Sequence, residues 1–126
     1  MAIFVGVDLV DINRLKKVFE RHRDRFQKRI FTEKEVEECE RRKNYEECYA
    51  ARFAAKEAFS KAIGTGMRQG VRFRDIEVIN LPSGKPVLRL YGRAKEIAGD
   101  AFVDVSLTHT ESFAIAVVVL ERKDNG

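Results

Sequence analysis

The feature that most constrains the fold is an alanine-rich stretch, Tyr45–Ile63, which is followed directly by Gly64. Alanine has the highest helix propensity, and glycine readily takes the left-handed conformation that commonly ends a helix. These residues therefore predict one long helix that stops at Gly64. The start signal at Asn44–Glu47 is weaker, so the beginning of this helix is less sharply defined than its end.

The first 35 residues predict a strand followed by two helices. Ile3–Val7 alternate in the manner of a strand that stops at Asp8. Asp11 is suited to cap the next helix, and Thr32–Glu35 forms a capping-box pattern that starts another. The apolar positions of the first helix recur at helical spacing and would form one stripe: Leu15, Phe19, His22 and Phe26.

The second half of the chain has the pattern of an antiparallel sheet. Phe113–Leu120 is almost continuously apolar, which predicts a last strand buried on both faces, and Ala94–Ala98 predicts a short helix. The expected strands are Ile76–Val78, Pro86–Leu90, Val103–Leu107 and Phe113–Leu120. The class is α+β: one small domain, residues 1–126, with a mainly antiparallel sheet packed against the long helix.

The composition, with 35% charged residues, argues against a membrane protein. No apolar run approaches the roughly 20 residues of a spanning helix, and the first residues predict a strand rather than a signal peptide. Cys39 and Cys48 form neither a disulfide framework nor a metal-ligand spacing, so we expect a cytoplasmic protein. A chain of 126 residues leaves much of its surface exposed, and an oligomer would bury more of it.

Positive charge is concentrated in one segment, from Ile12 to Arg29. This segment holds eight Lys or Arg against two acidic residues, whereas the formal net charge of the whole chain is +4. Such a segment attracts phosphate groups, nucleic acid or an acidic protein surface. An ordinary solvated helix face explains the same pattern equally well.

Two carboxylates and a lysine are the first candidates for chemistry. Asp8 follows an apolar strand, and Glu57 lies in the long helix four residues before Lys61. Taken separately, Asp8 can be a turn or capping residue, and Glu57 and Lys61 an exposed helix pair. If Asp8 packs against the helix, however, the two carboxylates could hold Mg²⁺, which typically takes one or two protein carboxylates.

The remaining polar motifs do not define a reaction. His109 lies among polar residues at the edge of the last hairpin, where a single histidine is more often a structural hydrogen-bonding group than a ligand. Gly64–Gly66 follows a helix, whereas a phosphate-binding loop would precede one, and it matches neither a Walker motif nor a dinucleotide fingerprint.

The stretch Arg52–Gly66, with the sequence RFAAKEAFSKAIGTG, resembles the holo-acyl-carrier-protein synthases, the small bacterial class of phosphopantetheinyl transferases. Further landmarks occur in the order of that family and span almost the whole chain. They are Gly6-Val7-Asp8, Arg14, Phe31-Thr32 with Glu35, Gly84-Lys85-Pro86, and Ser106–Thr110.

The resemblance implies transfer of 4′-phosphopantetheine from coenzyme A to a serine of apo acyl carrier protein, with release of adenosine 3′,5′-bisphosphate. By position, Asp8 and Glu57 look like ligands of Mg²⁺, or of Mn²⁺, and Lys61 would reach the same phosphates. A metal-bound water, Glu57 or another carboxylate could take the serine proton. The residues that would contact coenzyme A are Arg52, Lys61, Gly64, Thr65, His109 and Thr110.

The resemblance also implies partners. Carrier proteins of this kind are acidic, so the basic helix would bind them through Arg14, Arg21, Arg25 and Arg29, with Phe26 as an apolar contact. Members of the family are similar in forming homotrimers whose active sites are shared between subunits. The implied pathway is fatty acid biosynthesis, with no membrane and no nucleic acid among the partners.

Three other functions compete with this interpretation. A nucleic-acid-binding module has only the basic segment in its favour, without interleaved aromatic residues or a binding motif. A metal-dependent phosphohydrolase would use Asp8 and Glu57 to activate water, and would release free phosphopantetheine without a carrier. A degenerate member kept for assembly is disfavoured because Asp8, Glu57 and Lys61 are all present.

Overall fold

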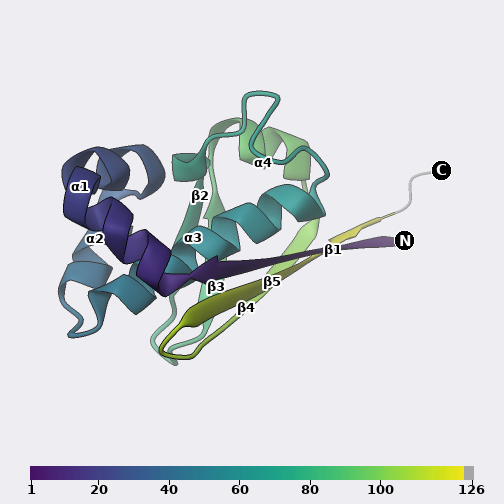
Figure 1. Cartoon of the computed structure of the whole chain (residues 1–126). Helices are drawn as coiled ribbons and strands as arrows, with labels where there is room; N and C mark the ends of the chain where they lie inside the picture. The colour runs from purple at the N-terminus through teal and green to yellow at the C-terminus, as the bar shows by residue number, and fades with distance from the viewer. Residues whose placement is uncertain (124–126) are drawn as a thin grey trace.

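Helix α3 (Tyr45–Ala62) runs through the middle of the molecule, with the other elements arranged around it (Figure 1). The structure is a computed structural model that describes residues 1–123. Before α3 come β1 (Ala2–Asp11), α1 (Ile12–Ile30) and α2 (Glu33–Glu40). After it come a 3₁₀ turn η1 (Phe73–Asp75), β2 (Ile76–Asn80), β3 (Pro86–Leu90), α4 (Gly92–Ala98), β4 (Phe102–His109) and β5 (Phe113–Arg122). The predicted α+β class is confirmed.

Two antiparallel sheets lie against α3. The larger has the strand order β1-β5-β4, and the smaller pairs β2 with β3. Ala54, Ala55 and Ala58 of α3 are fully buried. Because alanine side chains are short, the helix axis can lie close to the sheet, which brings residues of β1 near the residues of α3.

Gly6 is the point of closest approach between β1 and α3. A Cβ atom placed on Gly6 would lie 1.8 Å from the carbonyl oxygen of Ala58. Only glycine therefore allows the strand to lie on the helix backbone at this position. Since alternate residues of a strand share a face, Asp8 is directed to the same side as Gly6, toward α3.

Strand β1 is longer than the sequence pattern predicts. It ends at Asp11, not at Asp8, and its polar residue Asp8 lies within the strand. The prediction failed because Asp8 interrupts the apolar alternation although the backbone pairing with β5 continues. Asp11 does cap α1, as predicted: its carboxylate accepts hydrogen bonds from the backbone of Asn13 and Arg14.

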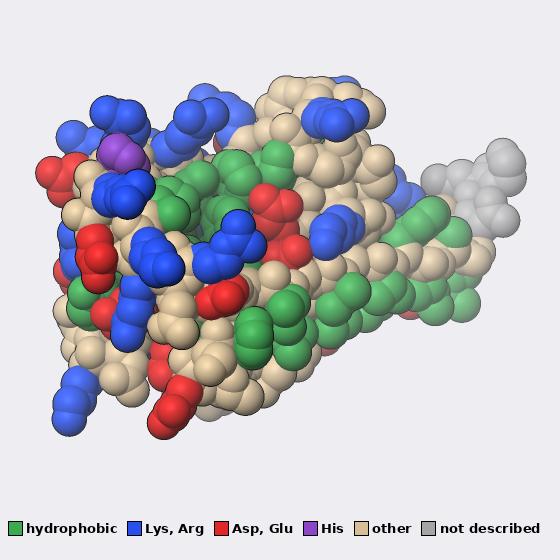
Figure 2. All heavy atoms as spheres, viewed as in Figure 1, with side chains coloured by type: hydrophobic (Ala, Val, Ile, Leu, Met, Phe, Trp, Pro, Cys, Tyr) green, Lys and Arg blue, Asp and Glu red, His purple; other side chains and the backbone are tan. Residues whose placement is uncertain are grey.

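Strand β5 is buried on one face, not on both. Its residues alternate, so that Ala114, Ala116, Val118 and Leu120 are buried under α3 while the residues between them are partly exposed. The other face of the sheet has no covering layer among the described residues. Figure 2 shows a row of hydrophobic side chains along β1 on this side; the exposed ones are Ile3, Val5, Val7 and Leu9.

Helices α1 and α2 follow the predicted patterns with one exception. The capping box of Thr32 and Glu35 is present at the start of α2. Within α1, Leu15 and Phe19 are buried as the helical stripe requires, but His22 is exposed and has non-helical backbone angles. The helix therefore bends at His22, and the stripe does not continue regularly across it.

The two cysteines differ from the prediction as well. Cys39 at the end of α2 and Cys48 in α3 form a disulfide bond. Their spacing alone gave no sign of it, because the bond depends on how α2 packs against α3. Among residues 1–123, no helix combines the length and the apolar character needed to cross a membrane.

Candidate active site

The first part of the site is an ion pair between β1 and α3. The ammonium group of Lys61 donates to Oδ1 of Asp8 at 3.0 Å and to the backbone oxygen of Val7, also at 3.0 Å. Asp8 is mostly covered, whereas about half of the Lys61 side chain is exposed. The condition that the sequence left open is therefore met: Asp8 packs against the long helix.

Glu57 lies one helical turn before Lys61 and completes the cluster. Burial raises the pKa of Glu57, and the negative charge of Asp8 raises it further, while Lys61 acts in the opposite direction. Both causes disfavour the ionised form of Glu57, and the charge of Lys61 offsets them only in part. A cation that bound between Asp8 and Glu57 would favour the ionised form.

Asp8 and Glu57 line one cleft, which has a volume of about 550 Å³. Its other walls are partly basic and partly apolar. Arg14 and Phe26 contribute to it from α1, and Phe53 contributes from α3. The cleft therefore joins two carboxylates to the start of the basic helix, in the region where Figure 2 shows basic side chains over α1.

A second cleft, of about 520 Å³, is lined by Arg52 and His109. Arg42 and Lys43, from the loop between α2 and α3, add positive charge to the same cleft. His109 faces Glu47, with 3.4 Å between Nδ1 and the nearer carboxylate oxygen. A basic cleft of this size suits a phosphate-bearing ligand.

Arg52 is unusual in this cleft because it is a buried cation. Its guanidinium donates to Oδ1 of Asn80 at 2.6 Å and to Sγ of Cys48 at 3.2 Å. Its Nε is the one buried side-chain nitrogen or oxygen without a hydrogen-bond partner among residues 1–123. Burial lowers the pKa of Arg52, with Glu35 partly offsetting the effect. A bound anion would satisfy such a group.

The structure separates some residues that the resemblance brings together. Gly64 and Thr65 line neither cleft; they follow the C-terminal end of α3, where Gly64 has a φ of +83°. Thr110 is engaged in the hairpin turn, where its hydroxyl accepts hydrogen bonds from Ser112 and Phe113. Their contact with coenzyme A stays a prediction.

The predicted carrier-binding residues divide in a similar way. Arg14 and Phe26 line the carboxylate cleft, whereas Arg21, Arg25 and Arg29 are exposed elsewhere on α1. Arg23, which lies between them, is not free: it forms an ion pair with Glu40 at 2.7 Å.

The residues suit a magnesium ion better than a metal that needs a full protein cage. Among residues 1–123 there is no group of three or more His, Cys, Asp or Glu placed to hold a metal. Two carboxylates with incomplete charge compensation fit the usual Mg²⁺ site, in which waters and substrate oxygens fill the other positions.

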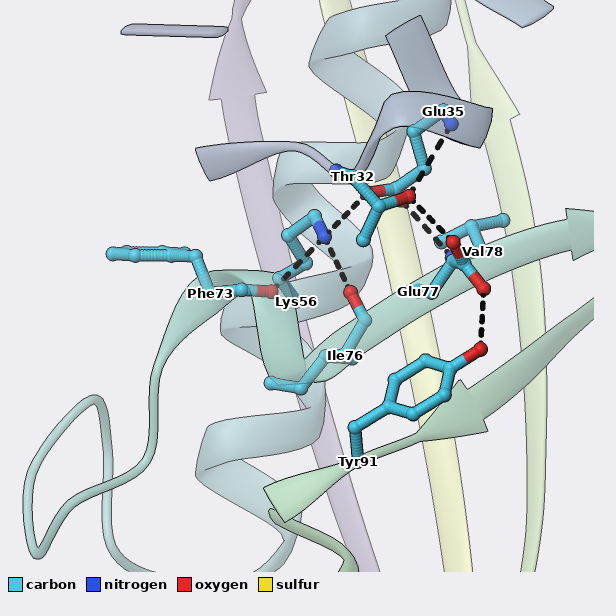
Figure 3. A network of polar contacts seen from close by, with 8 residues as sticks. All are labelled: Thr32, Glu35, Lys56, Phe73, Ile76, Glu77, Val78 and Tyr91. Carbon is cyan, nitrogen blue, oxygen red and sulfur yellow. Dashed lines mark hydrogen bonds and ion pairs between the residues drawn. The ribbon is translucent and has the colours of Figure 1, made fainter. Parts of the chain in front are cut away.

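The most important polar residue that the sequence did not reveal is Lys56, which precedes Glu57. Its ammonium donates to Oε1 of Glu35 at 2.7 Å and to the backbone oxygens of Phe73 and Ile76 (Figure 3). Lys56 and Glu35 are both fully buried. The pattern of an alanine-rich helix does not indicate that Lys56 is buried. The capping box indicated only the position of its partner, Glu35.

Comparison with known proteins identifies relatives over nearly the whole chain. The model of the 4′-phosphopantetheinyl transferase superfamily matches residues 4–118. The chain is 49% identical over 125 residues to a holo-[acyl-carrier-protein] synthase of Solibacter usitatus (strain Ellin6076), covering 97% of this chain and 100% of that one. A holo-[acyl-carrier-protein] synthase of Geobacter sp. (strain M21) is 48% identical, with the same coverage.

Solved structures of holo-[acyl-carrier-protein] synthases have the same fold as this chain. A holo-(acyl-carrier-protein) synthase of Bacillus anthracis str. Ames, in complex with CoA (3′,5′-ADP), superposes with a TM-score of 0.82 at 40% identity, covering 97% of this chain and 100% of that one. The Helicobacter pylori holo-[acyl-carrier-protein] synthase, in complex with coenzyme A, gives a TM-score of 0.83 at 30% identity, covering 93% and 99%.

Proposed function

The chain belongs to the holo-[acyl-carrier-protein] synthases of the 4′-phosphopantetheinyl transferase superfamily, and we propose that it transfers 4′-phosphopantetheine from coenzyme A to a serine of apo acyl carrier protein. The observation that carries this proposal is the meeting of Asp8, Glu57 and Lys61 in one place, from the first strand and the central helix. Two carboxylates and an ammonium group suit a reaction at a diphosphate.

Asp8 and Glu57 would hold Mg²⁺, with Mn²⁺ as the alternative. When bound, the ion supplies positive charge that stabilises the phosphate oxygens in the transition state and the leaving phosphate. The raised pKa of Glu57 supports this assignment, because burial and the neighbouring charge of Asp8 disfavour its ionised form, which a bound cation would favour.

Lys61 would bind and orient the phosphates. Its ammonium has two protein acceptors within residues 1–123, Asp8 and the oxygen of Val7, and so keeps a hydrogen for a substrate oxygen. The hydrogen bond to Asp8 also limits the rotamers of Lys61, which reduces the entropy lost on binding.

The basic cleft would bind the nucleotide end of coenzyme A. Arg52, His109, Arg42 and Lys43 provide the positive charge that its phosphates require. The complexes of the Bacillus anthracis and Helicobacter pylori enzymes with coenzyme A or its nucleotide support coenzyme A as the ligand, and the charge of the cleft is the reason to place its nucleotide end there.

The acidic carrier protein would bind along α1. Arg14 lies at the carboxylate cleft, so a carrier held there would present its serine to the reacting phosphate. The substitution Arg14→Glu should raise KM for the carrier about tenfold and leave KM for coenzyme A nearly unchanged, because a surface charge acts mainly on its own partner. An equal change in both constants would remove α1 as the docking face.

The uncovered face of the large sheet supports an oligomer, for which we propose the homotrimer with shared active sites that the family resemblance implies. Its β1 residues Ile3, Val5, Val7 and Leu9 are more than half exposed. A monomeric protein seldom leaves such a continuous apolar row in water. A neighbouring subunit on this face would bury the row, and the two separate clefts of each chain could then combine across the interface. We place the reaction in the cytoplasm and in fatty acid biosynthesis.

The decisive experiment is intact mass spectrometry of an apo acyl carrier protein incubated with this protein, coenzyme A and Mg²⁺, with a matched EDTA sample. The carrier should gain one phosphopantetheine mass, and the gain should disappear with EDTA. An unmodified carrier, tested across several carrier proteins, would overturn the proposed transfer. Free phosphopantetheine formed without any carrier would identify a phosphohydrolase instead.

A further inference from the structure

The disulfide between Cys39 and Cys48 lies at the wall of the basic cleft. Cys39 has no exposed surface, and Cys48, which lines the cleft, is 4% exposed. Cys48 is therefore both half of a covalent bond and part of the cleft wall. Neither cysteine contributes to the proposed transfer reaction.

The bond closes a loop that carries much of the cleft. Nine positions separate the two cysteines, and the connection between α2 and α3 lies within this span. Four residues of the enclosed segment line the cleft: Arg42, Lys43, Asn44 and Glu47. The disulfide thus fixes both ends of the segment that brings Arg42 and Lys43 to the basic cleft.

Cys48 also contacts the central cation of the cleft. Arg52, one helical turn further along α3, donates from a terminal nitrogen to Sγ of Cys48 at 3.2 Å. In the disulfide this sulfur is uncharged and a weak acceptor, so Arg52 keeps nearly its full positive charge for a ligand.

We propose that the Cys39–Cys48 disulfide is a redox switch that sets the affinity of the basic cleft for the nucleotide end of coenzyme A. The inference rests on the proposed function of that cleft. Oxidised protein binds the nucleotide tightly, and reduced protein binds it weakly. In a reducing compartment, disulfides are mostly transient and serve in redox sensing or catalysis, which suits this role.

The reduction step balances with a dithiol as the reductant. One thiolate of the dithiol attacks Sγ of Cys48, and the sulfur of Cys39 leaves with the electron pair of the S–S bond and takes up a proton. The second thiol of the reagent then displaces Cys48, which leaves as a thiol. Two electrons pass to the protein, and the dithiol becomes a cyclic disulfide.

Reduction weakens nucleotide binding for two reasons. The loop that holds Arg42 and Lys43 gains conformational freedom, so ordering it around a ligand costs more entropy. The free thiol of Cys48 also lies beside the guanidinium of Arg52, which favours its thiolate form. A thiolate there neutralises part of the charge that the phosphates of the nucleotide would otherwise meet.

The coupling acts in both directions. If the disulfide raises nucleotide affinity, bound nucleotide must favour the disulfide to the same degree. A ligand in the cleft also covers Cys48, which is the residue that the reductant attacks. Saturating nucleotide should therefore shift the dithiol concentration needed for half-reduction by the same factor as the change in Kd.

The test is titration calorimetry with adenosine 3′,5′-bisphosphate, which lacks the thiol of coenzyme A and so leaves the redox state undisturbed. Wild-type protein is measured oxidised and after complete reduction with dithiothreitol, with the thiols counted by alkylation and mass spectrometry. We expect Kd to rise on the order of five- to tenfold on reduction, in the range typical of coupled sites, and to return on reoxidation.

The variant Cys39→Ser with Cys48→Ser supplies the matched control. Its Kd should lie between those of oxidised and reduced wild type, because serine frees the loop but forms no thiolate beside Arg52, and it should not respond to dithiothreitol. Circular dichroism and thermal unfolding establish whether the variant is folded. If it is not, reversible reduction and reoxidation of one wild-type sample carries the test alone.

The outcomes separate the two proposals. A reduced form that binds the nucleotide as tightly as the oxidised form, in protein that modifies the carrier, overturns the switch and leaves the transfer reaction intact. Protein that neither binds the nucleotide in either state nor modifies a carrier overturns the proposed function, and the switch with it.

Discussion

Helix α3 carries two lysine–carboxylate pairs that differ chiefly in how deeply they are buried. Lys56 lies 2.7 Å from Glu35, and Lys61 lies 3.0 Å from Asp8. The first pair has no exposed side-chain surface, whereas the Lys61 side chain is 52% exposed and that of Asp8 is 17% exposed. Two similar ion pairs, five positions apart on one helix, therefore have different physical consequences.

The difference lies in how many hydrogen bonds remain for a ligand. Lys56 gives all three of its hydrogens to the protein, to Glu35 and to the backbone oxygens of Phe73 and Ile76 (Figure 3). It joins α3 to α2, to η1 and to the first residue of β2, and no donor remains. Lys61 gives only two within the described chain, at the edge of the carboxylate cleft. The buried pair therefore organises the fold, whereas Lys61 keeps one hydrogen that a substrate oxygen can accept.

The largest effect is expected for Lys56→Met. This substitution leaves the buried carboxylate of Glu35 without its cation, and breaking a buried pair in this way typically costs about 3–5 kcal/mol. Urea unfolding at neutral pH measures the loss. Lys61→Met is the matched control on the same helix, and it should lose less than about 1 kcal/mol because its pair is exposed.

The unpaired charge of Glu35 explains most of the stability that Lys56→Met is expected to lose. A double variant tests this explanation. Glu35→Gln combined with Lys56→Met removes both charges while leaving an acceptor for the backbone of Thr32 or Val78, which Glu35 binds in the wild type. It should recover part of the stability that Lys56→Met loses. A single variant as stable as wild type would show that the network does not anchor α3.

The next effect is on the reaction. Glu57→Gln should lower kcat/KM for transfer about 100-fold, or about 2.7 kcal/mol, because it removes a charged ligand of the proposed metal ion. Its stability should not fall, since burial and the neighbouring Asp8 already disfavour the ionised Glu57. Glu46→Gln, on the same helix but outside the cleft, should leave transfer unchanged. Full activity of Glu57→Gln would remove Glu57 from the site.

The sequence was sufficient for the parts of the fold that depend on local patterns. Composition and Gly64 predicted α3, the capping box predicted α2, and alternation predicted the hairpin of β4 and β5. It failed where the outcome depends on packing between distant segments. The one-sided burial of β5, the continuation of β1 beyond Asp8 and the disulfide all arise from contacts that no local pattern encodes.

The same division holds for the site. The i, i+4 spacing of Glu57 and Lys61 placed these two on one helix face, and the strand position of Asp8 made it a candidate. Lys56 could not be distinguished from a solvated lysine, because its burial depends on Phe73 and Ile76, which come from another part of the chain. The family resemblance supplied the reaction itself, which residue patterns alone did not.

A smaller effect should distinguish Lys61 from Glu57. Lys61→Met should lower kcat/KM about tenfold, or about 1.4 kcal/mol, since one cation among several binds the phosphates. Steady-state kinetics with varied coenzyme A measures this change. Lys61→Arg should restore part of the rate, because it keeps the positive charge. Equal activity of the Met and Arg variants would mean that Lys61 does not bind substrate.

The smallest effect is a pH dependence of stability that arises at Glu57, beside the exposed pair. Glu57 has a folded-state pKa raised above its ordinary value of 4.5, chiefly by burial and then by Asp8, against the opposing charge of Lys61. The protonated form is therefore favoured by folding. Its contribution to stability is fully present below pH 4.5 and is lost as the pH rises through the raised pKa.

Glu57→Gln cannot titrate, so its stability relative to wild type should rise with pH across this window. Urea unfolding of both proteins over a pH series measures the difference. Adding Mg²⁺ at the upper end should stabilise wild type more than the variant, because the ion binds the ionised carboxylates of the folded state. A stability difference that stays constant with pH would mean that burial and the charge of Asp8 do not disfavour the ionised form of Glu57, and the cleft beside the exposed pair would lose its support as a cation site.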